Sequence, residues 1–171
     1  MRKVRRNAFA LLFLTVGLLY SVATSYAQEP TILGVAELDK LVPTNFYFEG
    51  QLGPTQKRNA AAVRFDAKRH FIAALVDTSG YASNIRSKYE GFLIADTRVS
   101  AGGVELAAGS YGFGFTNDMK MNIFDLGGKQ LHSVAAPKDE KLQSPRPLII
   151  VKSGSDLRLY RGRNYVVIAA K

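Results

Sequence analysis

Short runs rich in β-branched and aromatic residues dominate the chain from residue 45 onwards, and turn-forming residues separate them. This pattern is typical of strands. Ahead of them, Leu38, Leu41 and Val42 have helical spacing and Pro43 follows, which predicts one short helix over Glu37–Val42. The predicted strands are Asn45–Gln51, Ala60–Phe65, His70–Val76, Tyr89–Val99, Ser110–Thr116, Met121–Leu126, Gln130–Ala135, Leu148–Lys152, Leu157–Arg161 and Tyr165–Ala169.

The connections between these strands indicate an antiparallel arrangement. Gly127-Gly128, Ser153–Asp156 and Arg161–Asn164 are too short to carry the crossover helices that parallel strands require. Many short strands with glycine-rich turns favour an all-β fold, a single antiparallel β-sandwich or a small closed β-barrel. We expect one domain over residues 28–171.

The segment Val104–Phe115 is expected to place Tyr111, Phe113 and Phe115 on one face of a strand. Gly112 and Gly114 leave the other face bare. Glycine inside a strand indicates a bend or a close neighbour, here either an aromatic ring or a ligand.

Three segments depart from the strand pattern. Residues 53–59 are polar and predict a loop, and residues 136–147 predict a charged, proline-bearing connection of the kind that carries function or disorder. Between Thr78 and Lys88 we expect a turn and a short helical turn over 83–88, with Ser83 or Asn84 as its N-cap.

Residues 1–27 have the order of a secretory signal peptide: four basic residues, an apolar run over 8–23, and Ser25-Tyr26-Ala27 before the expected cleavage point. We therefore predict export to the periplasm or the extracellular space and no transmembrane span after cleavage. Removal of these residues leaves 19 basic against 14 acidic residues, a net charge of +5. This balance favours anionic glycan or phospholipid over nucleic acid, for which no basic, aromatic-interleaved stripe is present.

The 171 residues include no Cys, which excludes disulfides, zinc–thiolate sites and thiol catalysis. His70 and His132 are the only imidazoles, and neither has a carboxylate or a second His at ligand spacing, so we predict no metal site and no cofactor. The run Ala74–Gly80 resembles the strand and turn that present the catalytic Asp of aspartic proteases, but Ser79 is inserted before Gly80. A polar turn in which Asp77 caps the backbone is the preferred interpretation, and a dimeric hydrolase using Asp77 is the alternative.

Two groupings are candidate binding residues. Tyr81, Tyr89 and Tyr111, with Arg86 nearby, offer rings with polar tips for a sugar or an amphipathic ligand, and packing under a loop explains the tyrosines equally well. Arg158, Arg161 and Arg163, with Lys152, are candidates for anion binding, and protection of an edge strand is the alternative.

The segments Leu41–Phe46, Ala74–Tyr81, Tyr89–Ile94 and Gly109–Phe115 together resemble a group of small exported bacterial proteins of unassigned function. The run Leu106–Tyr111 is also similar to a hairpin of secreted β-sandwich modules. The resemblance implies export and one domain, and it implies no activity.

We therefore expect a non-enzymatic binding module for a small or amphipathic ligand, a lipid or an anionic envelope glycan. The alternative is a structural surface protein that forms homo-oligomers by pairing its strand edges.

Overall fold

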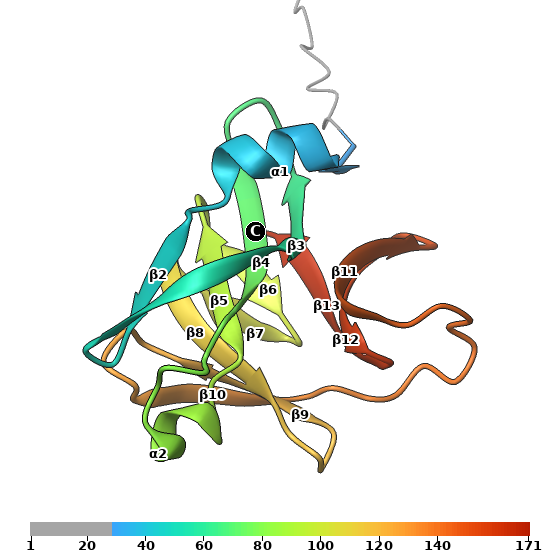
Figure 1. The fold of residues 1–171 in the computed structure, drawn as a ribbon. Helices are drawn as coiled ribbons and strands as arrows, with labels where there is room; N and C mark the ends of the chain where they lie inside the picture. The colour runs from blue at the N-terminus through green and yellow to red at the C-terminus, as the bar shows by residue number, and fades with distance from the viewer. Residues whose placement is uncertain (1–28) are drawn as a thin grey trace, which may run out of the picture.

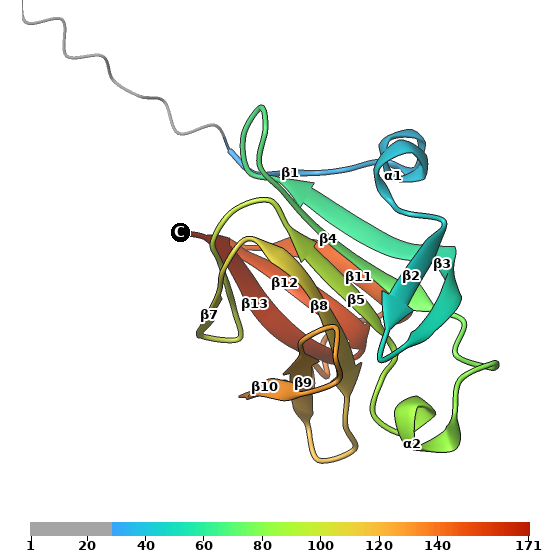
Figure 2. The same ribbon diagram turned by 90° about the vertical axis from the view of Figure 1, so that its left-hand side faces the viewer.

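The computed structural model describes residues 29–171, in which two antiparallel sheets pack face to face (Figures 1 and 2). The larger sheet has the order β1-β3-β4-β5-β8-β9-β10, with β2 also paired to β3, and the smaller has the order β11-β12-β13-β6-β7. The elements are β1 (Thr31–Ile32), α1 (Val35–Leu41), β2 (Asn45–Phe48), β3 (Gln51–Arg64), β4 (His70–Val76), α2 (Ser83–Arg86), β5 (Gly91–Ala95), β6 (Val99–Ala101), β7 (Val104–Leu106), β8 (Gly109–Phe115), β9 (Lys120–Phe124), β10 (Gln130–Ala135), β11 (Arg146–Ser153), β12 (Asp156–Gly162) and β13 (Asn164–Ala170).

This architecture confirms the predicted all-β antiparallel fold. Short connections join neighbouring strands, and the β6–β7 hairpin crosses from the larger sheet to the smaller and back. Its two turn residues, Gly102 and Gly103, have φ of 59° and 87°, a backbone that glycine adopts without strain. The two sheets do not close on each other, so the fold is consistent with a β-sandwich and not with the closed barrel.

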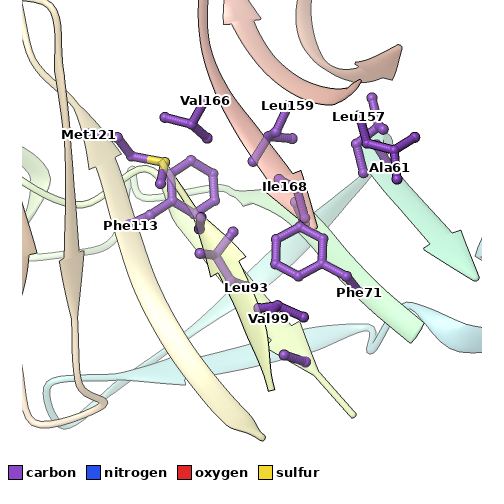
Figure 3. Close-up of a cluster of buried hydrophobic side chains, with 14 of the residues drawn as sticks. Ala61, Phe71, Leu93, Val99, Phe113, Met121, Leu157, Leu159, Val166 and Ile168 are labelled. Carbon is purple, nitrogen blue, oxygen red and sulfur yellow. The ribbon is translucent and has the colours of Figure 1, made fainter. Parts of the chain in front are cut away.

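The main core fills the space between the two sheets. In Figure 3, Phe113 and Met121 of the larger sheet point toward Val166 and Ile168 of the smaller one. Phe113, as predicted, lies on the core side of β8, and Tyr111 and Phe115 pack partly against the same cluster. Burial of this apolar surface is the main source of the stability of the sandwich.

A second core lies on the opposite face of the larger sheet. Its centre is aromatic: the ring of Phe46 stacks on Phe92 at 4.1 Å between centroids, and Phe48 stacks on Tyr89 at 4.0 Å. A Cβ added to Gly112 would lie 2.3 Å from Cε2 of Phe48. The close neighbour that this glycine predicted is therefore an aromatic ring.

Several local predictions were wrong. The polar segment 53–59 is part of strand β3, because residues 53–55 pair with β2 and β4 and residues 56–59 form a bulge within the strand. The predicted strand Tyr89–Val99 divides between β5 and β6, because the chain changes sheet inside it. The helical turn α2 exists, but Ala82 is its N-cap and no side chain caps it.

The charged connection 136–147 is tied to the β12–β13 turn. The N–H of Asp139 donates to the Arg163 carbonyl, the N–H of Tyr165 donates to the Pro137 carbonyl, and Lys138 forms a bridge with Asn164. This segment is therefore held at the β12–β13 turn by backbone pairing with the first residues of β13.

Candidate functional site

A groove of about 410 Å³ opens at one side of the sandwich, between β11 of the smaller sheet and the β1, α1 and β3 segments of the larger one. In Figure 1, β11 forms one lateral border of the molecule and α1 lies beside the end of β3. The groove is lined by Ile32, Leu33, Gly34, Val35, Leu38, Asp39, Lys57, Arg58, Asn59, Ala60, Ala61, Arg146, Pro147, Leu148, Ile149 and Ile150. Its volume lies within the range of about 300–1,000 Å³ that is usual for small-molecule sites.

The first wall of the groove follows from the way the chain enters the fold. The two residues of β1 pair with the end of β3, and the Leu33 N–H donates to the Ala62 carbonyl at 2.9 Å. Helix α1 then begins at Val35, where the Glu37 carboxylate accepts the Gly34 N–H at 3.3 Å. These bonds fix α1 beside β3.

A bulge in β3 supplies the polar side chains of this wall. Thr55 pairs with Val76 and Ala60 with Ala74, so residues 56–59 stand opposite a single residue of β4. Such an excess bends a strand and re-aims its side chains. Here it carries Lys57, Arg58 and Asn59 to the groove, which explains why this stretch of strand has the composition of a loop.

The floor of the groove joins both cores, because Ala61, Leu148 and Ile150 belong to the main core and Leu33 belongs to the second core. Leu33, Ala61, Leu148 and Ile150 are each at most 5% exposed, whereas Ile32 is 39% exposed and Val35 77% exposed. The apolar character therefore continues from the buried core to the surface. This continuity distinguishes the groove from a simple gap between polar loops.

Cationic groups surround this apolar floor. The Lys57 ammonium donates to the Asp39 carbonyl at 3.0 Å, and the guanidinium groups of Arg58 and Arg146 have no ion-pair or hydrogen-bond partner within residues 29–171. Asp39 is the one acidic residue that lines the groove in the described part of the chain. The site therefore combines an apolar slot with an excess of positive charge.

Strand β11 also presents a free edge at the groove. It pairs with β12 on one side, and no backbone hydrogen bond joins its other side to any strand among the described residues. An edge of this kind offers N–H and C=O groups to an incoming polar or extended chain.

The predicted tyrosine site divides between the two cores. Tyr81 and Tyr89 lie together in the second core, 5% and 1% exposed, with their ring centroids 5.7 Å apart. Burial raises the pKa of both phenols. Tyr111 packs against the main core and donates its hydroxyl to the Ala107 carbonyl, and Arg86 is exposed on α2. The four residues therefore do not line one pocket.

The three arginines predicted to bind anions have partners within the protein. Arg161 donates to Glu90 Oε1 from Nε at 3.2 Å and from Nη2 at 3.0 Å. Arg158 lies 3.6 Å from Asp139 and over the ring of Tyr165, and Arg163 donates to the carbonyls of the 139–142 segment. The alternative of edge protection is wrong for Arg158 and Arg161, because β12 is an interior strand.

The hydrogen bonds to the Asp139 carboxylate change its pKa. The Tyr160 hydroxyl donates to the Asp139 carboxylate at 2.8 Å, and this bond, together with the Lys141 N–H and the nearby Arg158, lowers the pKa of Asp139. The charged form of Asp139 is therefore the form that the fold favours.

The remaining candidates are separate from the groove. Asp77 is exposed and accepts the Ser79 N–H at 3.0 Å, a contact that lowers its pKa and agrees with the turn interpretation. His70 Nδ1 lies 3.1 Å from Asp96 Oδ2, a partner that sequence spacing did not reveal. Among residues 29–171, no group of three or more His, Asp or Glu residues is arranged to hold a metal ion.

The predicted signal peptide and its cleavage point lie outside the described residues. Neither α1 nor α2, the helices of residues 29–171, is long and apolar enough to cross a membrane. No protein-family model, no curated protein and no solved structure matches the chain.

Proposed function

We propose that the protein is an exported, non-enzymatic binding module whose groove between β11 and the β1–α1–β3 wall holds a small amphipathic anion. The observation that carries the proposal is the continuity of the groove floor with the core, under a rim of cationic groups. An acyl or alkyl chain against Leu33, Leu148 and Ile150 would leave water for an apolar surface.

The charge of the rim supports an anionic head group. Arg58 and Arg146 have no acidic partner among the described residues, so a sulfate, phosphate or carboxylate would gain charge-assisted hydrogen bonds without breaking an existing ion pair. A glycan is less well supported, because none of the groove-lining residues within 29–171 is aromatic and sugar recognition relies on ring faces.

A calorimetric titration with dodecyl sulfate below its micelle concentration tests this proposal. We expect saturable binding to the wild-type protein and weaker binding of dodecyl maltoside, which has the same chain and a neutral head. Arg58→Gln and Arg146→Gln should each weaken dodecyl sulfate binding by about fivefold, the equivalent of about 1 kcal/mol.

Arg86→Gln is the matched control, because Arg86 is exposed and outside the groove and has no ion-pair partner in residues 29–171. It should leave the affinity unchanged. Equal losses for all three variants, or no saturable binding of dodecyl sulfate, would contradict the proposal.

Export is part of the proposal and has its own measurement. When the full chain is expressed in a bacterium with a general secretion pathway, N-terminal sequencing of the mature protein should start at Gln28. A cytoplasmic product whose N-terminus is Met1 or Arg2 would contradict export. It would not bear on the proposal that the groove binds a ligand.

A second candidate function is self-association through a strand edge. The free outer side of β11 supports it, because such an edge is a template for pairing with a second copy. Sedimentation velocity over a hundredfold range of concentration should then show a rising mass that dodecyl sulfate lowers, since both occupants use the β11 side of the groove. A monomer at all concentrations would exclude this candidate.

A further inference from the structure

The mouth of the groove is an exposed apolar surface. Val35 has the largest exposed fraction of any large hydrophobic residue within 29–171, 77%, and Ile32 beside it is 39% exposed. Both residues line the groove. Val35 is the first residue of α1, so its side chain costs nothing in core packing if it enters another apolar phase.

The polar residues around this mouth are predominantly basic. Lys57, Arg58 and Arg146 line the groove. Asp39 is the one acidic residue of the lining among residues 29–171. The mouth therefore combines exposed apolar side chains with three basic residues of the same groove, a combination characteristic of surfaces that bind anionic lipid interfaces.

We propose that this mouth, formed by Ile32, Val35, Lys57, Arg58 and Arg146, docks on an anionic lipid bilayer. The inference rests on the proposed function, since the bilayer would be the reservoir of the amphipathic anion. Docked in this way, the groove opens toward the lipid, and an acyl chain passes from one apolar phase to another without crossing water.

The charge of the mouth favours a bilayer over a second copy of the chain. A symmetric dimer through this surface would bring the same cations from two copies together, and like charges in apposition oppose association. An anionic leaflet offers a surface of opposite charge. Each basic residue near it raises the membrane partition coefficient by about fivefold.

Sedimentation with vesicles measures the docking. One set of vesicles contains equal parts of phosphatidylglycerol and phosphatidylcholine, and the other contains phosphatidylcholine alone. We expect binding to the anionic vesicles that falls as salt is raised, and little binding to the neutral ones. Val35→Asp should lower the partition coefficient by about tenfold or more, because it removes the apolar tip and adds a negative charge.

Leu52→Asp is the matched control, since Leu52 is 67% exposed on β3 but lies outside the groove. Asp at position 35 is compatible with the fold because an acidic residue in the first turn of a helix interacts favourably with the helix dipole. Every variant is made in the full chain, and intact mass verifies that wild type and variants carry the same N-terminus, so that residues 1–28 contribute equally to each partition coefficient.

The outcomes separate this inference from the proposed function. Dodecyl sulfate binding without vesicle binding, or equal losses for Val35→Asp and Leu52→Asp, would overturn the docking surface and leave the groove proposal intact. Vesicle binding that Val35→Asp abolishes, with no saturable binding of dodecyl sulfate, would support the surface and overturn the ligand groove. A vesicle-independent rise in mass that Val35→Asp removes and Leu52→Asp does not would assign the mouth to a second copy and overturn the bilayer.

Discussion

Two sets of arginine side chains in this molecule differ in whether the protein itself supplies partners for their guanidinium groups. Arg158, Arg161 and Arg163 stand close together in the sequence, and each has carboxylate or carbonyl partners within the fold. Arg58 and Arg146 are far apart in the sequence, come together at the groove, and have no such partner among the described residues. The arginines that are close together in the sequence therefore bind groups within the protein. The arginines that we propose for ligand binding are brought together only by the fold.

We expect the largest change in the free energy of unfolding for a substitution at Glu90, the acceptor of Arg161. Its Oε1 atom accepts both hydrogen bonds from Arg161, and its Oε2 atom accepts the Phe115 N–H at 2.9 Å. Glu90→Ala would leave both donors without their acceptor and should lower the free energy of unfolding by about 2 kcal/mol. Urea unfolding measures this loss.

The counterpart on the groove side is Arg58→Ala. Because this guanidinium has no partner within residues 29–171, its removal should change the free energy of unfolding by no more than about 0.5 kcal/mol. A loss as large as that of Glu90→Ala would mean that both sets of cations are structural.

Tyr81 and Tyr89, which the sequence suggested as ligand-binding residues, are also part of the internal packing. The hydroxyl of Tyr89 is buried and has no hydrogen-bond partner among the described residues, whereas the Tyr81 hydroxyl donates to the carbonyls of Phe46 and Gln51 at 3.4 Å. Tyr89→Phe should therefore raise the free energy of unfolding by about 1 kcal/mol, and Tyr81→Phe should not. Thermal unfolding of the two variants side by side is the measurement, and a destabilised Tyr89→Phe would contradict the packing seen here.

A smaller effect is expected from the pH dependence of the Asp139 tie. The pKa of Asp139 is lower in the folded protein than in the unfolded chain, so its contribution to stability is present above about pH 4 and is lost as the pH falls through the folded-state pKa. Asp139→Asn should therefore be less stable than wild type at pH 7, and the difference should shrink toward pH 3. A difference that is constant with pH would mean that the carboxylate charge is not involved.

The sequence predicted the scaffold better than the site, for a physical reason. The strands His70–Val76 and Gln130–Ala135 match their predicted bounds, because local β propensity and flanking turns act on the same residues. The bulge at 56–59 depends on its pairing with β4, which local composition does not encode. The groove joins residues of β1, α1, β3 and β11, so no spacing along the chain reveals it.

The central claim is that ligands bind where cations are unpaired over the apolar end of the core. Its most direct test is to map the backbone amide NMR shifts that dodecyl sulfate causes at concentrations below its micelle threshold. We expect the shifts to concentrate in residues 32–38, 57–61 and 146–150. Shifts concentrated around Tyr81 and Tyr89, or around Arg158, Arg161 and Arg163, with the groove unchanged, would contradict it.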